Sequence, residues 1–168
     1  MWCMASYEWT VIGAGPAGIA AVGRLLDHGI AAERIAWVDP AFAGGDIGQK
    51  WRSVPSNTHV GLFLEYFNGS KAFRFSEAPP MALREIDPQE TCALGLVAEP
   101  LVWVTGQLRE RVDALATTAT ALFLANRRWR IQTDHGDVFS TNVVLAVGAD
   151  PKKLCHPGLD GQGSDRKP

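Results

Sequence analysis

The chain has 168 residues and a net charge of −2; 46 % of its residues are hydrophobic and 20 % are charged. These values predict one soluble globular domain with its own core, and they disfavour a nucleic-acid partner, which usually selects a basic surface. The cysteines Cys3, Cys92 and Cys155 are widely separated, so we expect free thiols, no bound metal and a cytoplasmic location. No apolar stretch is long enough to cross a bilayer, and we expect no membrane partner.

The first elements are expected to be a strand, a glycine-rich turn, a helix and a second strand. Residues 7–14 (YEWTVIGA) form a short apolar run ending in a glycine turn, which is typical of a buried parallel strand. From Ala17, apolar residues recur at helical spacing as far as His28. Residues 34–40 (RIAWVDP) follow as the next strand, so the pattern predicts a βαβ unit with a right-handed crossover.

The rest of the chain is less regular. Residues 41–100 are expected to be a long functional loop, in which residues 59–67 (HVGLFLEYF) fit either a strand or a short helix. A helix is expected from Pro100, with the proline in its first turn. The segments that follow predict two or three strands of a meander and then a further apolar strand; they are residues 118–126, 129–133, 138–140 and 141–149.

The glycine turn has the spacing GxGxxG, with Gly13, Gly15 and Gly18 between the first strand and its helix. In such a turn the first glycine allows a tight bend, the second lets a pyrophosphate approach the backbone, and the third lets the helix pack closely. The helix N-terminus offers free N–H groups to the anion. Asp39 ends the next strand, where a carboxylate accepts ribose hydroxyls and repels a 2′-phosphate. The sequence therefore predicts a dinucleotide site.

Two further segments carry a resemblance to a known superfamily. Residues 129–158, with TNVVLAVG followed by Pro157 and Gly158, resemble the second fingerprint of FAD-dependent oxidoreductases with the two-dinucleotide-binding fold, which include glutathione reductase and the flavin-containing monooxygenases. Residues 11–18 (VIGAGPAG) have the form of the glycine motif common there. Residues 39–51 (DPAFAGGDIGQKW) are similar to the stretch where flavin monooxygenases carry an acidic residue, a Gly-Gly pair and a tryptophan near the flavin.

The resemblance implies a Rossmann-type, three-layer α/β domain that binds FAD, with a parallel sheet, helices on one face and a β-meander on the other. It implies that residues 1–158 form this domain and that residues 118–124 (TATALFL) are the third parallel strand. Residues 159–168 are polar and glycine-rich, and we expect them to be a disordered tail. NADPH or NADH is the implied co-substrate, and the redox chemistry belongs to the cofactor. The expected cofactor-binding residues are Gly13, Gly15, Pro16, Ala17, Gly18, Asp39, Gly44, Gly45, Trp51, Arg52 and Gly148.

Several alternatives stay open. The indole of Trp51 fits a wall of the flavin ring and Arg52 a partner of the pyrophosphate, but a core tryptophan and a surface arginine fit equally. The cluster at residues 56–59 fits either hydrogen bonding to a ligand or turn chemistry. Members of the superfamily continue into an NAD(P)H domain that we do not find here. The chain is therefore expected to be the FAD-binding portion of an NAD(P)H-dependent, monooxygenase-like oxidoreductase.

The same pattern fits three other functions. The chain could be a subunit that a partner chain or self-association through an open sheet edge completes, or a non-catalytic dinucleotide-binding module. An NAD-dependent dehydrogenase would need an acid–base pair such as Tyr-x-x-x-Lys. Tyr66 and Lys71 are five positions apart, which does not place them on one helical face as that pair.

Overall fold

The computed structural model describes residues 6–148. Four 3₁₀ turns lie between its longer elements, at Ala32–Arg34, Lys71–Phe73, Phe75–Glu77 and Ala82–Glu85. In chain order the helices and strands are β1 Ser6–Ile12, α1 Pro16–Asp27, β2 Ile35–Val38, α2 Gly45–Gln49, β3 Pro55–His59, α3 Val60–Asn68, β4 Thr91–Ala93, α4 Leu94–Arg109, β5 Asp113–Leu115, β6 Ala119–Ala125, β7 Arg128–Thr133 and β8 Gly136–Leu145.

The main sheet has the strand order β5-β2-β1-β8-β7-β6. Strands β5, β2, β1 and β8 run parallel, with Val11 of β1 opposite Trp37 of β2 on one side and Val144 of β8 on the other. Strands β7 and β6 continue from β8 as an antiparallel meander. The predicted βαβ unit of β1, α1 and β2 is confirmed, and the two strands and helix meet at the glycine turn.

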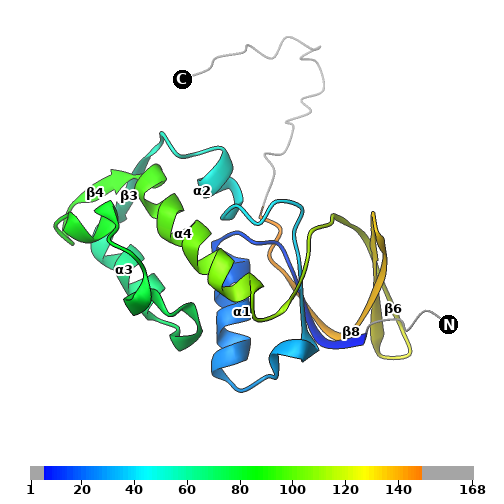
Figure 1. The fold of residues 1–168 in the computed structure, drawn as a ribbon. Coiled ribbons are helices and arrows are strands. Elements are labelled where there is room, and N and C mark those ends of the chain that lie inside the picture. Colours follow the sequence, from blue (N-terminus) through cyan, green and yellow to red (C-terminus); the bar gives the residue numbers. More distant parts are fainter. Residues whose placement is uncertain (1–5, 149–168) are drawn as a thin grey trace, which may run out of the picture.

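The two faces of the parallel strands bury different side chains, because successive residues of a strand point to opposite faces. Val11 and Trp37 point toward the helices, where they join the larger buried cluster. Ile12 and Val38 point the other way and pack with Ile131 of the meander. Figure 1 accordingly shows α1 and α4 on one side of the strands and β6 on the far side. The predicted three-layer α/β fold is confirmed.

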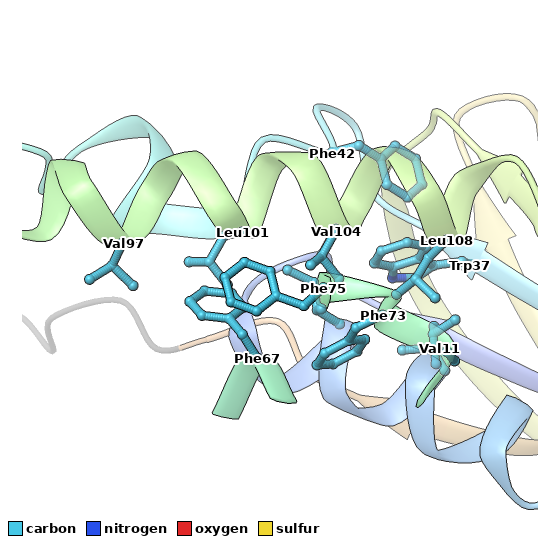
Figure 2. Close-up of a cluster of buried hydrophobic side chains, with 14 of the residues drawn as sticks. Val11, Trp37, Phe42, Phe67, Phe73, Phe75, Val97, Leu101, Val104 and Leu108 are labelled. Atoms are coloured by element: carbon cyan, nitrogen blue, oxygen red, sulfur yellow. The ribbon is translucent and has the colours of Figure 1, made fainter. Parts of the chain in front are cut away.

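Helix α4 supplies one wall of the larger core. Val97, Leu101, Val104 and Leu108 recur at helical spacing and are at most 2 % exposed. Figure 2 shows them along one side of the helix, with Phe67, Phe73, Phe75 and Trp37 below. At about 25 cal/mol per Å² of apolar surface, each such side chain contributes about 1.5–3 kcal/mol by burial.

The prediction that a helix begins at Pro100 is wrong. Helix α4 begins at Leu94, and Pro100 lies inside it and is buried. A proline there removes the hydrogen bond to the carbonyl of Leu96 and costs about 3 kcal/mol. The four buried side chains of α4 together outweigh this loss, so the helix continues through the proline.

The assignment of residues 118–124 to the third parallel strand is also wrong. All of these residues except Thr118 belong to β6, which pairs antiparallel with β7, as the meander interpretation predicts. The parallel strand on the other side of β2 from β1 is β5, which has only three residues and precedes β6 in the sequence. A run this short shows no periodicity, whereas the longer apolar segment beside it has the pattern of a strand.

Two further expectations change. Most of the segments at 138–140 and 141–149 form one strand, β8. Its first half pairs with β7, and from Phe139, which lies opposite Ser6, it pairs with β1. Residues 41–100 are not one long loop, since they form α2, β3, α3, β4, three 3₁₀ turns and the start of α4. Residues 59–67 lie mostly in α3 and are helical. The predicted disordered tail at 159–168 lies outside the described residues.

Within residues 6–148, no helix has the length and apolar character needed to span a membrane. The same residues contain no group of three or more His, Cys, Asp or Glu side chains arranged to hold a metal ion.

Candidate functional site

A cleft of about 820 Å³ opens at the carboxyl ends of the parallel strands. It starts where β1, β2 and β8 end, at Ile12, Val38 and Leu145, which is where open α/β sheets bind ligands. Its volume lies within the range of about 300–1,000 Å³ that is usual for small-molecule sites. The lining residues are Ile12, Gly13, Ala14, Gly15, Pro16, Ala17, Val38, Asp39, Pro40, Gly45, Asp46, Ile47, Gln49, Trp51, Thr117, Thr118, Ala119, Leu145, Ala146, Val147 and Gly148.

Gly13 and Gly18 are required by the fold itself. Gly13 has φ +107°, and a Cβ there would lie 2.2 Å from the carbonyl oxygen of Ala146. A Cβ on Gly18 would lie 1.9 Å from the carbonyl oxygen of Gly13. The N–H of Gly13 donates to the Val38 carbonyl at 2.8 Å, and its carbonyl accepts the indole N–H of Trp37 at 2.9 Å. The turn is thus held by two hydrogen bonds from β2 and packs against the backbone that follows β8.

Gly15 differs from these two glycines. Its φ of −79° and ψ of −178° are extended backbone that any residue adopts. The nearest atom to a Cβ built there is the Cα of Gly45, at 3.8 Å, which is ordinary contact. A side-chain methyl group at Gly15 would therefore fit the protein's own packing, although the residue lines the cleft. The close approach of a ligand to this backbone would explain why a glycine occupies position 15, which the protein's own packing does not require.

The N-terminus of α1 meets the cleft with its positive end uncompensated by side chains. Pro16 opens the helix, Gly15 precedes it without a side-chain cap, and no acidic residue lies in the first turn. The N–H groups of Ala17 and Gly18 have no partner inside the helix, since the first turn has none to offer. Their partial positive charge favours an anion in the cleft.

The carboxylate of Asp39 holds the loop that borders the cleft. Its Oδ2 accepts the N–H of Ala14 at 2.8 Å, so β2 is tied to the glycine turn. Its Oδ1 accepts the N–H groups of Ala41 at 2.8 Å and Phe42 at 2.6 Å. A carboxylate offers about four acceptor positions, so these bonds leave capacity for a further donor from a ligand. Asp39 is therefore both a structural residue and a cleft residue.

Of the remaining predicted residues, some line the cleft and others do not. Gly45, Trp51 and Gly148 line it, and the indole of Trp51 is 46 % exposed. Gly44 is buried and does not line the cleft; it has φ +76°, and a Cβ there would make a tight contact with Leu101. Arg52 lies outside the lining, where its carbonyl accepts the N–H of Gly95 at 2.7 Å. Its role as a phosphate partner stays a prediction.

The cluster at 56–59 lies in β3 and does not line the cleft. Its Ser56 hydroxyl oxygen accepts the N–H of Thr58 at 2.9 Å, which favours the interpretation as local backbone bonding. Tyr66 also lies outside the cleft lining, and its hydroxyl donates to the carbonyl of Pro16 at 2.7 Å. This position removes the acid–base candidate of the dehydrogenase alternative.

Sequence reasoning missed several cleft residues. Thr117 and Thr118 follow β5, and the Thr117 hydroxyl is buried without a partner among the described residues. The rule that ligands bind at the carboxyl ends of parallel strands identifies this position once β5 is recognised. Asp46 and Gln49 of α2 also line the cleft. Trp37 supports the turn from below, and only the structure pairs its indole with Gly13.

Comparison with solved structures gives the following similarities. The chain aligns with a flavin-containing monooxygenase from Stenotrophomonas maltophilia at a TM-score of 0.60 and 18 % identity, covering 89 % of this chain and 42 % of that one. A cyclohexanone monooxygenase from Rhodococcus sp. Phi1 bound to NADP+ aligns at 0.63 and 22 % identity, covering 93 % and 29 %. The chain has the fold of the flavin-containing monooxygenases. This flavin-monooxygenase fold confirms the resemblance drawn from the fingerprints.

No protein-family model matches the chain. One curated relative, the monooxygenase AgnR1 from Paecilomyces divaricatus, is 47 % identical over 64 residues, which are 38 % of this chain and 16 % of that protein. The chain therefore spans less than half the length of each of these monooxygenases.

Proposed function

We propose that this chain is the FAD-binding portion of an NAD(P)H-dependent, monooxygenase-like flavoprotein oxidoreductase, with residues 1–158 as the FAD-binding domain. One observation carries the proposal: the uncapped N-terminus of α1, with Gly15 and Ala17, lines the same cleft as Asp39. An anion binds at the helix end while a ribose binds at the carboxylate, and a dinucleotide supplies both groups. The flavin monooxygenases with the same fold support FAD as the dinucleotide.

The cleft residues fit FAD along its length. The N–H groups of Gly15 and Ala17 are suited to the pyrophosphate, and the carboxylate of Asp39 to the adenosine ribose. Gly45, Trp51 and Gly148 lie on the lining, and we propose that they border the flavin end. When bound, FAD supplies the hydride and oxygen chemistry, and the protein's contribution is to bind, orient and shield it. Arg52 is proposed as a further phosphate partner on sequence grounds alone.

A partner strand beside β8 is a second part of the proposal. Strand β7 pairs with β8 only as far as Ser140, so residues 141–145 pair with β1 alone among the described strands. Leu145 and Val147 are 61 % and 68 % exposed at the same edge of the cleft. An open edge and exposed apolar side chains favour association, and a second chain or a further segment added here would close the cleft.

A cytoplasmic location is also proposed. Cys92 is a free thiol, and its burial raises its pKa, so it is an unreactive structural residue that suits a reducing compartment.

The test is to mix the purified chain with excess FAD, separate it by gel filtration and record the visible spectrum of the protein peak. We expect the flavin bands to elute with the protein. The elution volume reports in the same run whether the chain associates. NADPH oxidation by the flavin-loaded protein is the next assay, and it distinguishes an oxidoreductase from a non-catalytic binding module. A protein peak that takes up no FAD at saturating concentration contradicts the proposal.

A further inference from the structure

Tyr66 connects helix α3 to the first turn of α1. Its hydroxyl donates to the carbonyl oxygen of Pro16 at 2.7 Å, across 50 positions of sequence. Its ring packs against Phe67, at 5.1 Å between centroids, and against Phe73, at 5.6 Å. The aromatic contacts fix the ring, so the hydroxyl is held on the carbonyl rather than rotating away from it.

The Pro16 carbonyl belongs to the same peptide group as the N–H of Ala17. No peptide bond in the described chain is cis, so this carbonyl and this N–H point in opposite directions along the helix. Ala17 lines the cleft, and its N–H is one of the first-turn groups that lack a partner inside the helix. A hydrogen bond to one end of a peptide group polarises the group and strengthens the donor at its other end.

We infer that Tyr66 is a positioning residue for a pyrophosphate: by donating to Pro16, it orients and polarises the Ala17 N–H toward the bound anion. The inference rests on the proposed function, since it assumes that a dinucleotide occupies the cleft. Tyr66 does not line the cleft, so it would act through the Pro16–Ala17 peptide group.

The surroundings of Tyr66 keep it a donor. Burial raises its pKa above the ordinary tyrosine value, so the phenol stays protonated throughout the physiological range. A purely structural role, in which the bond only joins α3 to α1, makes a different prediction. Removing the hydroxyl would then lower stability and affect all ligands of the cleft alike.

The chain provides a matched control, because it has two tyrosines and the hydroxyl of each donates a partly buried hydrogen bond. Tyr7 donates to the carboxylate of Asp113, at the end of β1 remote from the glycine turn. We would titrate the wild type, Tyr66→Phe and Tyr7→Phe with ADP and with adenosine, following amide signals by NMR. ADP carries the pyrophosphate and adenosine does not.

We expect Tyr66→Phe to weaken ADP binding about three- to tenfold and to leave adenosine binding unchanged, as one lost hydrogen bond predicts. Tyr7→Phe should change neither affinity. In ligand-free Tyr66→Phe, the amide proton signal of Ala17 should move upfield, because its peptide group has lost a donor. This shift needs no bound ligand and reports the polarisation directly.

Three results would overturn the inference. Equal ADP affinity of wild type and Tyr66→Phe removes the positioning role, and equal weakening of ADP and adenosine makes the role purely structural. If Tyr66→Phe fails to fold, the bond is needed for the fold itself and the inference fails as well. A wild type that binds neither ADP nor FAD contradicts the proposed function instead, and this outcome is recognised before any variant is compared.

Discussion

At the scale of single residues, glycine is needed at the three positions of the turn for different physical reasons. A side chain on Gly13 or Gly18 would meet a backbone carbonyl at 2.2 or 1.9 Å, whereas one on Gly15 would meet nothing closer than 3.8 Å. The sequence pattern gives all three the same weight. The structure separates two glycines that build the turn from one that faces the cleft, and this separation is testable.

We expect Gly15→Ala to fold with nearly wild-type stability and to bind ADP about tenfold to a hundredfold more weakly. The added methyl group fits the free protein but blocks the approach of a pyrophosphate, at a cost of about 1–3 kcal/mol. Gly18→Ala is the matched variant and should lower the free energy of unfolding by at least a similar amount. Thermal unfolding and calorimetric titration with ADP measure both. Unchanged ADP affinity in Gly15→Ala would show that no phosphate reaches this backbone.

Asp39→Asn should affect both stability and ligand choice. The amide keeps one acceptor oxygen for three N–H donors, so we expect the free energy of unfolding to fall by about 1–3 kcal/mol. Binding of ADP should weaken, and discrimination against adenosine 2′,5′-bisphosphate should decrease, because the repelling charge is gone. Asp87→Asn is the control: it changes a carboxylate that also accepts a nearby backbone N–H, that of Gln89 at 2.8 Å, outside the cleft lining. An unaltered ratio of the two affinities in Asp39→Asn would remove Asp39 from ribose recognition.

At the scale of elements, helix α4 contains a proline, Pro100, that lowers its stability. We expect Pro100→Ala to raise the free energy of unfolding by about 1–2 kcal/mol, since the new N–H reaches the Leu96 carbonyl and the loss of buried ring surface offsets part of the gain. Pro80→Ala, at an exposed loop position, should lower stability slightly by loosening the unfolded chain. Urea denaturation midpoints measure both changes. A destabilised Pro100→Ala would mean that the ring itself fills the core.

The elements that the sequence predicts correctly are those whose signal is local. The glycine turn, β1, α1 and β2 combine an apolar pattern with residues that begin or end an element, so their order and the carboxylate after β2 follow from the chain alone. Strand β5 is too short to show a period, and only its pairing with β2 identifies it. Helix α4 begins before Pro100 because the burial of four of its side chains overrides proline, which is a strong local signal for a helix start.

The cleft residues can likewise be divided into those that a local sequence signal predicts and those that it does not. Gly15, Ala17 and Asp39 follow from a motif with fixed spacing, whereas Thr117 and Thr118 reach the cleft through the missed strand β5. The bonds from Trp37 to Gly13 and from Tyr66 to Pro16 join residues 24 and 50 positions apart. No pattern in the sequence pairs them, because the pairing depends on how the layers pack.

For the whole molecule, the phenols of Tyr7 and Tyr66 predict a loss of stability at alkaline pH. The pKa values of Tyr7 and Tyr66 are raised above 10.0, chiefly by burial and, at Tyr7, also by Asp113. A folded-state pKa above the unfolded one contributes stability that is complete below pH 10 and is lost as the pH rises toward the folded value. Unfolding free energies measured from pH 8 upward should fall above about pH 10. Tyr7→Phe and Tyr66→Phe should each flatten this fall, and identical curves for all three proteins would contradict it.

The central claim is that the cleft at the carboxyl ends of β1, β2 and β8 binds a dinucleotide by its pyrophosphate. A crystal structure of the chain soaked with FAD tests it most directly. We predict the pyrophosphate within hydrogen-bond distance of the Gly15 and Ala17 N–H groups, and a ribose hydroxyl donating to the carboxylate of Asp39. FAD bound elsewhere, or a glycine turn without ligand at saturating FAD, would contradict the account.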